Sequence, residues 1–205
     1  MKWPEIEYFS SKLSHGSNTK ILDIGCGNGR LLQAFCNIDV GNYIGYDLSD
    51  ELLNEARKEH VGFKFIQGDM LELADKIHQK FDAIFFIASF HHLTNIQERI
   101  SVLQKAKKLL NKDGKIYMTN WALESSLNAE KYRESRIIGS ETDFGSSDYE
   151  IKIGNYKRYY HCFHLKELEY IFEQAGFEIS ENRLFENDKN FISIIQIAKN
   201  PYTKS

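Results

Sequence analysis

Residues 20–29 read Lys20-Ile-Leu-Asp-Ile-Gly-Cys-Gly-Asn-Gly29, a short apolar run that leads into three alternating glycines. Glycines let a backbone turn tightly and approach a ligand, and a helix that begins at Arg30 would present free N–H groups there. The spacing is Gly-x-Gly-x-Gly, and Asp23 stands two residues before the first glycine. This departs from the Gly-x-Gly-x-x-Gly pattern that fits a dinucleotide pyrophosphate, which argues against a nicotinamide cofactor.

From this turn onward the chain alternates short β-rich runs with longer helical stretches, a pattern typical of βαβ units and a parallel sheet. The strands expected in this part are residues 20–24, 43–47, 63–67, 81–88 and 115–120. The helices expected between them are residues 30–36, 49–59, 71–78 and 95–110. Ser49 is the predicted N-cap of the second helix, because Asp50 and Glu51 follow it and favour the positive end of the helix dipole.

The regular alternation lapses after Trp121 and resumes at an amphipathic helix over 165–175, with Gly176 as its C-cap. Two strands, 177–185 and 191–198, follow with a polar turn between them. We therefore expect an α/β fold with a Rossmann-like, doubly wound sheet of seven strands, mostly parallel, with an antiparallel C-terminal hairpin.

The interruption points to a substrate-side segment. We interpret residues 1–205 as a single domain with an insertion at about 121–164. Long irregular insertions in compact domains are often lids or binding loops, so this insertion is where substrate specificity is expected.

The composition is that of a globular chain. Of its 205 residues, 42% are hydrophobic and 27% are charged, enough for a sizeable core. The formal net charge of −3 excludes a basic field over the whole molecule of the kind that binds nucleic acid nonspecifically, and leaves room for a local basic patch. Cys26, Cys36 and Cys162 are irregularly spaced, so we expect no disulfide framework, no metal site and a cytoplasmic location. The apolar runs are too short for a membrane span, so we expect no membrane partner.

Acidic residues follow the second and third expected strands. Asp47 lies 18 residues after Gly29, close to the separation of about 20 at which a carboxylate bonds a ribose diol. Asp69 follows the third strand and precedes Met70. Unrelated loop acids are the simpler alternative, but three such features at the carboxyl ends of consecutive strands are hard to obtain by chance.

This whole pattern resembles the class I S-adenosylmethionine-dependent methyltransferases over about residues 20–120. The resemblance implies S-adenosyl-L-methionine as the cofactor, with the three glycines near its methionine part and Asp47 on the ribose hydroxyls. Asp69 and Met70 would flank the adenine. The cofactor-binding residues implied are Asp23, Gly25, Cys26, Gly27, Gly29, Asp47, Leu48, Asp69, Met70 and Ser89.

The fourth expected strand ends in Ala88-Ser-Phe-His-His-Leu93. Methyltransferases of planar amide or adenine nitrogens use an Asn/Asp-Pro-Pro-Tyr/Phe sequence at this place, so those acceptors are disfavoured. An imidazole titrates near neutrality, and His91 or His92 can therefore position an acceptor or act as a base. The alternative is that His91 packs inside and only one ring faces the cleft.

A second segment, Tyr156-Lys-Arg-Tyr-Tyr-His-Cys-Phe163, interleaves basic and aromatic side chains, and no acid lies between Lys152 and Lys166. Guanidinium groups bind carboxylates and phosphates bidentately, and aromatic faces stack on bases. A β-edge or lid whose tyrosines only cover the cofactor is the alternative. The basic run over 99–115 is expected to be a solvated helix face, and contact with phosphates is the alternative.

Together with Trp3-Pro4, Phe90–Leu93, Asn120–Ala122 and Asn190-Phe191, this segment resembles the tRNA wobble-uridine carboxymethyl methyltransferases of the AlkB-homologue type. In that family a motif like Tyr-His-Arg-Tyr/Phe-Tyr-His precedes a Glu-Leu helix, here Lys166-Glu-Leu-Glu169. The family esterifies the carboxylate of 5-carboxymethyluridine at the wobble position. The resemblance therefore implies a tRNA anticodon loop as the substrate.

The implied chemistry requires no base. A uridine acetate carboxylate has a pKa of about 4, so it is ionised at pH 7. Catalysis would consist of aligning oxygen, methyl carbon and sulfur and excluding water. We expect Arg158 to hold one carboxylate oxygen while the other reacts, since a stronger grip would stabilise the ground state. Tyr160 and His161 would shape the pocket, with His92 beside it.

Two other functions remain open. The first is methylation of a small molecule, a metabolite such as a quinone precursor or a carboxylic acid, which the acidic balance and short chain favour and which needs a closed apolar pocket. The second is a noncatalytic, cofactor-binding partner subunit, against which the complete cofactor pattern argues. Members of the tRNA family also commonly require a small zinc-binding activator subunit, which covers an apolar strip beside the third strand, where Phe63 and Phe65 lie.

Overall fold

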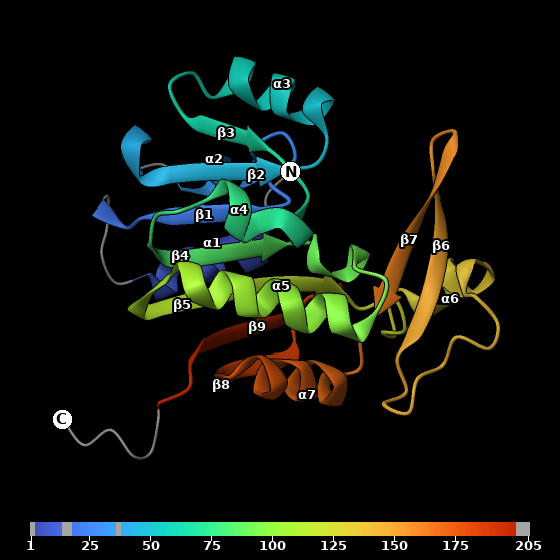
Figure 1. The fold of residues 1–205 in the computed structure, drawn as a ribbon. Coiled ribbons are helices and arrows are strands. Elements are labelled where there is room, and N and C mark those ends of the chain that lie inside the picture. The colour runs from blue at the N-terminus through green and yellow to red at the C-terminus, as the bar shows by residue number, and fades with distance from the viewer. Residues whose placement is uncertain (1–2, 14–17, 36–37, 200–205) are drawn as a thin grey trace.

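The computed structural model describes residues 3–13, 18–35 and 38–199, so Cys36 lies outside it. Its described residues form a seven-stranded sheet in the order β3-β2-β1-β4-β5-β9-β8 (Figure 1). The strands are β1 (Ile21–Ile24), β2 (Tyr43–Asp47), β3 (Lys64–Gln67), β4 (Phe81–Ile87), β5 (Leu110–Trp121), β8 (Phe177–Leu184) and β9 (Asn190–Ile197). The pairs among β1 to β5 are parallel, whereas β9 runs antiparallel to both β5 and β8. The predicted doubly wound sheet with an antiparallel C-terminal hairpin is confirmed.

Helices cover both faces of this sheet. One face carries α1 (Pro4–Lys12), α2 (Arg30–Ala34) and α3 (Asp50–Glu59). The other carries α4 (Leu73–Lys76), α5 (Ile96–Leu109) and α7 (Leu165–Ala175). The 3₁₀ turns are η2 (Val40–Asn42), η3 (Met70–Glu72), η4 (Phe90–His92) and η5 (Arg133–Ser135).

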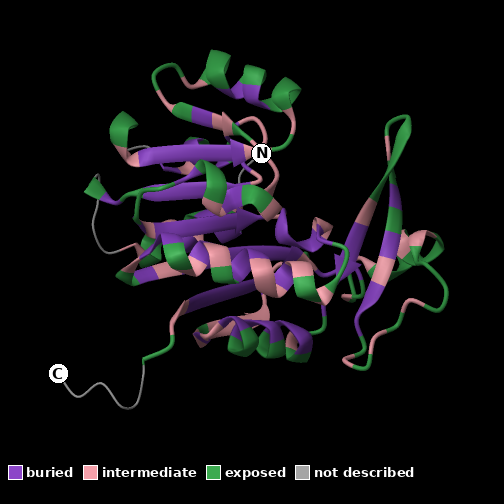
Figure 2. Cartoon of the chain, in the orientation of Figure 1, coloured by how far each residue is buried: buried purple, intermediate pink, exposed green. Residues whose placement is uncertain are grey.

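The two hydrophobic cores explain why the strands are apolar throughout. In β4, Ile84 and Phe86 belong to the cluster under α5 and α7, while Phe85 packs against Phe9 of α1 and Tyr117 on the opposite face. A parallel strand covered on both faces cannot alternate with polar residues. Figure 2 shows this burial along the central strands.

Local signals set the helix ends where they were expected. The Ser49 hydroxyl accepts from the Leu52 N–H at 3.3 Å and caps α3. Gly176 ends α7 with a φ of 80°, a left-handed conformation that glycine adopts without a Cβ penalty. Asn95 caps α5 by accepting from the Glu98 N–H at 2.9 Å.

Some elements differ from the expectation. Helix α1 was not predicted; it begins with Pro4, whose fixed φ suits a first helical position, and is held by burial of Ile6 and Phe9. The helix expected over 71–78 is shorter, because η3 precedes α4 and the helix ends at Lys76. Strand β5 begins at Leu110 rather than 115, because Leu110 already pairs with Phe81.

The segment between 121 and 164 contains more regular structure than predicted. It holds the short helix α6 (Ala129–Tyr132) and a hairpin of β6 (Ser147–Ile153) and β7 (Tyr156–Cys162). The hairpin forms a separate sheet beyond the carboxyl ends of the parallel strands (Figure 1). On its inner face, Tyr149, Ile151, Tyr160 and Cys162 form a small core together with Leu123, which follows β5.

The structure also shows the surroundings of the other residues that the sequence analysis named. Phe65 is buried and Phe63 half-buried, and both rings contact Tyr43 edge-on. Cys26 and Cys162 are buried free thiols. Within the described ranges, no helix has the length and apolar character that a membrane crossing requires. The same residues contain no group of His, Cys, Asp and Glu side chains arranged to hold a metal ion.

Candidate active site

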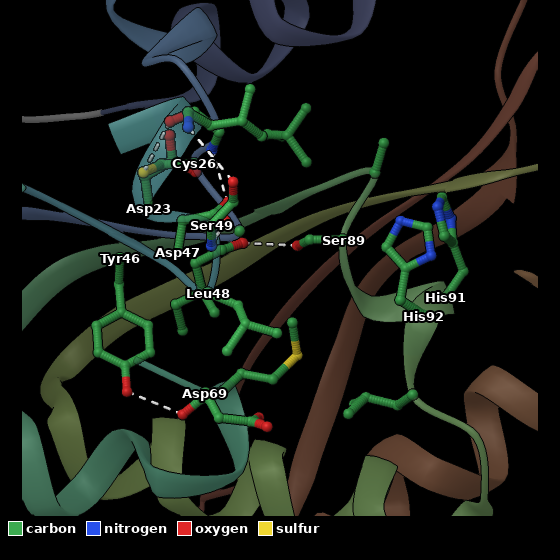
Figure 3. A pocket seen from close by; sticks show the side chains of 18 of the residues that line it. Asp23, Cys26, Tyr46, Asp47, Leu48, Ser49, Asp69, Ser89, His91 and His92 are labelled. Atoms are coloured by element: carbon green, nitrogen blue, oxygen red, sulfur yellow. Dashed lines mark hydrogen bonds between the residues drawn. The ribbon is translucent and has the colours of Figure 1, made fainter. Parts of the chain in front are cut away.

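A cleft of about 950 Å³ opens along the carboxyl ends of the parallel strands and reaches the inner face of the hairpin. In Figure 3 the carboxylates of Asp23, Asp47 and Asp69 lie toward one part of it and the two histidines toward the other. Most residues predicted for cofactor and acceptor line this cleft: Asp23, Gly25, Cys26, Gly27, Asp47, Leu48, Asp69, Met70, Ser89, His92, Arg158 and Tyr160. Gly29 and His161 are not among its lining residues.

The glycine turn between β1 and α2 forms the floor of the cleft. Gly25 has a φ of 75°, and a Cβ there would collide with the Ser89 side chain. Gly27, with a φ of 54°, donates its N–H to Asp47 Oδ2 at 2.8 Å, which ties the turn to the end of β2. Gly29 has a φ of 84°, which favours glycine, and a Cβ there would lie 2.6 Å from His60 Cδ2, just after α3, so packing also accounts for this glycine.

Asp23 is a buried carboxylate with a free oxygen at the cleft wall. Its Oδ2 accepts from the Tyr43 hydroxyl at 2.9 Å, whereas Oδ1 has no partner among the described residues. Burial raises the pKa of Asp23 to about 7, and the nearby Asp47 charge adds to the rise, while Tyr43 and Arg30 oppose it. A cation placed at Oδ1 would satisfy this carboxylate and relieve the cost of burying it.

Backbone N–H groups hold the carboxylates of Asp47 and Asp69, and the carboxylate oxygens keep lone pairs for further hydrogen bonds. Asp47 Oδ1 accepts from the Ser49 N–H at 2.9 Å, in addition to the bond from Gly27. Asp69 Oδ1 accepts from the Leu71 N–H at 2.8 Å and begins η3. Each carboxylate oxygen has a second lone pair, so both acids can still accept hydrogen bonds from a ligand.

Apolar side chains lie between these acids. Leu48 is 66% exposed although it follows a buried strand, and Met70 and Leu71 line the same part of the cleft. An exposed leucine beside carboxylates that can bind a ligand offers a surface for a flat apolar ring of that ligand. Cys26 lines the cleft as a buried thiol, whose pKa burial raises.

The turn after β4 delivers the histidines. Ala88 has a φ of 51°, a strained conformation that its N–H stabilises by donating to Thr119 Oγ1 at 2.9 Å and to the Thr119 carbonyl at 3.1 Å. Ser89 then donates to the Ile24 carbonyl at 2.6 Å, which joins this turn to the glycine turn. The chain continues into η4, which carries His91 and His92.

The two histidines have different surroundings. His91 is fully buried, its Nδ1 faces the Trp121 N–H at 3.3 Å, and burial lowers its pKa well below the usual value. His92 Nδ1 lies 2.9 Å from the Tyr159 carbonyl and so must carry the proton. Burial and the Arg158 charge lower the pKa of His92 to about 4, which leaves a neutral ring with a lone pair on Nε2.

Strand β7 supplies the far wall. Alternate residues of a strand share a face, and Tyr156, Arg158 and Tyr160 all face the cleft. The Tyr160 ring stacks on Trp121 with centroids 4.9 Å apart and meets the His92 ring at 4.7 Å. Arg158 is exposed, and no carboxylate pairs with it within the part of the chain that the structure describes.

His161 does not shape the pocket as predicted. It lies on the opposite face of β7, because odd and even positions of a strand point to opposite sides. Its side chain is buried between the carboxylates of Asp148 and Glu167.

Sequence reasoning singled out no role for Trp3 and Arg30, which both line the cleft with the Arg30 guanidinium 4.5 Å above the indole. Trp121 and Tyr156 were quoted only as parts of motifs. Once residues 156–162 are recognised as a strand, its two-residue period places Tyr156 on the face of the cleft and His161 on the opposite face.

Comparisons with known proteins bear on this arrangement. A methyltransferase domain family matches residues 15–176. The chain is 29% identical over 200 residues to the tRNA (carboxymethyluridine(34)-5-O)-methyltransferase of Schizosaccharomyces pombe, which covers 88% of this chain and 82% of that relative. It is 35% identical over 145 residues to the tRNA (carboxymethyluridine(34)-5-O)-methyltransferase alkbh8 of Xenopus tropicalis, covering 71% of this chain and 22% of that relative. The glycopeptide N-methyltransferase MtfA, solved with S-adenosyl-L-methionine, shares the fold with a TM-score of 0.69 at 17% identity, covering 94% of this chain and 92% of that one.

Proposed function

We propose that this chain, which belongs to the methyltransferase domain family and is an S-adenosylmethionine-dependent methyltransferase, esterifies the carboxylate of 5-carboxymethyluridine at the wobble position of a tRNA. The observation that carries the proposal is that Arg158, free of any described carboxylate partner, opens onto the same cleft as the cofactor wall. The relatives named for this reaction support the choice of acceptor. In this proposal residues 121–164 form the substrate-side insertion of a single domain.

The cofactor wall fits S-adenosyl-L-methionine. The orphaned Asp23 Oδ1 suits the ammonium group of the methionine part, and the close approach of Gly25 and Gly27 leaves room for its chain. Asp47 retains lone pairs for two ribose hydroxyls. Leu48 and Met70 suit the two faces of the adenine, with Asp69 at its edge.

When bound, this cofactor supplies an electrophilic methyl group on a sulfonium. The protein then has to place a nucleophilic oxygen in line with it. Arg158 can bind one oxygen of an acceptor carboxylate and leave the other free, and it neutralises a charge that would otherwise be expensive in the cleft. A carboxylate is ionised at neutral pH, so no side chain has to remove a proton.

The uncharged state of His92 suits this acceptor. A neutral ring with a free Nε2 lone pair can accept a hydrogen bond from the ring N–H of uracil. The half-buried Trp121 ring, which is supported by its stacking on Tyr160, offers an aromatic surface for the base of a nucleotide that leaves its stack. Charge recognition by Arg158 and base recognition by these rings together favour a carboxylated base over a simple carboxylic acid.

We also propose the small zinc-binding activator as a partner at the outer edge of β3. This strand ends the sheet, and Val61 just before it is 81% exposed. An outer strand with an exposed apolar neighbour is a suitable place for another chain. Phe65 packs inward and does not contribute to that surface.

Incubation with methyl-labelled S-adenosyl-L-methionine and total tRNA that carries unesterified carboxymethyluridine tests the proposal. The reaction is run with and without an activator subunit, and the labelled nucleosides are identified by mass. We expect label in the methyl ester of the wobble uridine. If no tRNA is labelled under either condition while cofactor binding is retained, the proposal is wrong, and a small-molecule acceptor or a noncatalytic subunit takes its place.

A further inference from the structure

A buried ionic network lies behind the acceptor wall, on the face of β7 that does not line the cleft. Arg99 of α5 donates from Nη1 to Glu167 Oε1 at 2.9 Å, and Glu167 Oε2 meets His161 Nε2 at 2.8 Å. His161 Nδ1 meets Asp148 Oδ1 at 2.6 Å, and the same oxygen accepts from the Tyr159 hydroxyl at 2.8 Å. The Arg99, Glu167 and His161 side chains are 3%, 1% and 2% exposed, respectively.

Hydrogen-bond geometry fixes the charges in this network. Each ring nitrogen of His161 faces a carboxylate oxygen, and an imidazolium ring satisfies both oxygens because each of its nitrogens is an N–H donor. Burial alone would raise the pKa of Asp148 and of Glu167. The hydrogen bonds from His161 and its neighbours, together with the charges of His161 and Arg99, outweigh burial and lower both pKa values. Two cations therefore balance two anions, which is the condition under which buried charges are tolerated.

The network joins the hairpin to two helices of the main fold. Asp148 lies on β6 and His161 on β7, where they are direct cross-strand partners. Glu167 lies in the first turn of α7, and Arg99 lies on α5. Strands β6 and β7 do not pair with the central sheet. The bonds of this network attach the base of the hairpin to the main fold instead.

The same residues reach the turn that carries the histidines. Arg99 donates from Nε and Nη2 to the Leu93 carbonyl at 3.3 and 3.0 Å, at the end of η4. The backbone carbonyl of Tyr159 accepts from His92, and the Tyr159 hydroxyl accepts from Arg99 at 3.4 Å. Tyr159 lies between the cleft-facing Arg158 and Tyr160 in β7. Its bonds, on the other side of the strand, thus set the position of Arg158 relative to His92.

We propose that His161 and Glu167 are positioning residues, which hold β7 against α5, α7 and η4 so that Arg158 and His92 face one point of the cleft. The inference rests on the proposed function in one respect only, namely that Arg158 binds the acceptor. This role explains why the Tyr156–Phe163 segment and the Glu-Leu start of the next helix occur together in the sequence. His161 of the segment bonds to Glu167 of that helix.

Two substitutions at one position separate positioning from packing. Glu167→Ala removes the carboxylate that pairs with Arg99 and leaves His161 Nε2 without an acceptor, while Asp148 still faces Nδ1, so the network keeps two cations and only one anion. Glu167→Gln keeps the bonds: its oxygen accepts from Arg99, and its amide donates to His161 Nε2, which becomes neutral, so the network stays balanced in charge. Because a misplacement of about 1 Å can cost about 100-fold in rate, we expect Glu167→Ala to lower kcat/KM for the tRNA acceptor by at least about tenfold.

We expect Glu167→Gln to restore kcat/KM to within a few-fold of the wild-type value, and the KM for the cofactor to stay unchanged in both variants. Tyr159→Phe removes one hydroxyl and keeps the backbone bond to His92, so it should show a smaller loss in the same direction. Glu173→Ala is the matched control, because Glu173 lies on the same helix, α7, with an exposed side chain that takes no part in the network. It should leave kcat/KM unchanged.

Hydrogen exchange of the full-length protein, measured by mass spectrometry, gives a readout that needs no acceptor. Glu167→Ala should speed exchange over 147–162 and leave 18–35 unchanged. Unchanged exchange over 147–162, or equal losses in acceptor and cofactor kinetics, would overturn the positioning role. Absence of tRNA methylation by the wild-type protein would refute the proposed function instead, and the exchange comparison would still decide whether the network holds the hairpin.

Discussion

Replacing Asp23 with asparagine should stabilise the protein at high pH and weaken its cofactor binding. Burial raises the pKa of this carboxyl from 3.8 to about 7. Between these values the folded protein holds a proton that the unfolded chain has released, so the stability supplied by the protonated carboxyl is full below pH 3.8 and is lost as pH rises to about 7. With 1.36 kcal/mol for each pKa unit, the loss is at most about 4 kcal/mol.

The asparagine side chain carries no charge and can still accept from Tyr43. At pH 8 we expect the variant to melt several degrees higher than the wild type, since about 1 kcal/mol corresponds to roughly 2–4 °C for a chain of this size. At pH 5 the difference should be less than half as large, because only about 1.6 kcal/mol of the wild-type stability has then been lost through ionisation of the unfolded chain. Cofactor affinity should move the other way: the wild type binds more tightly as pH rises toward 7, and the variant loses at least about tenfold at pH 8.

Thermal unfolding at pH 5 and pH 8, together with calorimetric titration of S-adenosyl-L-methionine in the same buffers, measures both effects. Asp75→Asn, which neutralises an exposed carboxylate, serves as the matched control and should alter neither quantity by much. The reasoning is refuted if Asp23→Asn melts no higher than the wild type at pH 8, or if the wild-type cofactor affinity is flat from pH 5.5 to pH 8.

Four further outcomes are expected. Arg158→Ala should reduce methyl transfer by about 100-fold and leave the cofactor dissociation constant nearly unchanged, as measured by single-turnover transfer and calorimetry; unchanged turnover would remove its assigned role. Gly25→Ala should lower the melting temperature more than Gly154→Ala, because both glycines have positive φ but only a Cβ at Gly25 meets a side chain, that of Ser89. Burial and Arg158 lower the pKa of His92 to about 4, so stability should decline as pH falls from 6.5 toward 4, and His92→Asn should make urea unfolding curves at pH 5 and pH 7 more alike. Binding of tRNA should weaken steeply with salt while cofactor binding does not; a salt-independent RNA affinity would contradict recognition through phosphates.

The cofactor half of the cleft could be predicted because its signals are local. The glycine turn, Asp47 and Asp69 each follow a strand whose apolar run is visible in the sequence. Parallel pairing then brings the ends of these strands to one edge of the sheet. The structure shows this pairing between β1 and β2 and between β2 and β3. Gly29 has the same signal, and its close contact with His60 offers packing as a second cause, which spacing alone does not distinguish from ligand contact.

The acceptor half depends on contacts between distant parts of the chain, so its signals in the sequence are weaker. Strands β6 and β7 lie in a stretch with polar and aromatic residues mixed, so their two-residue period was hidden. His161 was assigned to the pocket because it lies in the same motif as Arg158, whereas its place is decided by Arg99 and Glu167, which are 68 residues apart. Helix α1 was missed because its stability comes from burial of Ile6 and Phe9 against the sheet rather than from its own sequence.

The two halves of the cleft therefore differ in how well they tolerate amino-acid substitutions. The cofactor wall is part of the central sheet, where Gly25 abuts Ser89 and Gly27 bonds to Asp47, so a substitution there disturbs the core. The acceptor wall is a hairpin joined to that core through a balanced set of charges at its base, with its cleft-facing residues on the opposite side of the strand. Residues such as Tyr156 and Arg158 can be exchanged on such a support without loss of the fold, which is a physical reason for acceptor choice to reside in the hairpin and cofactor choice in the sheet.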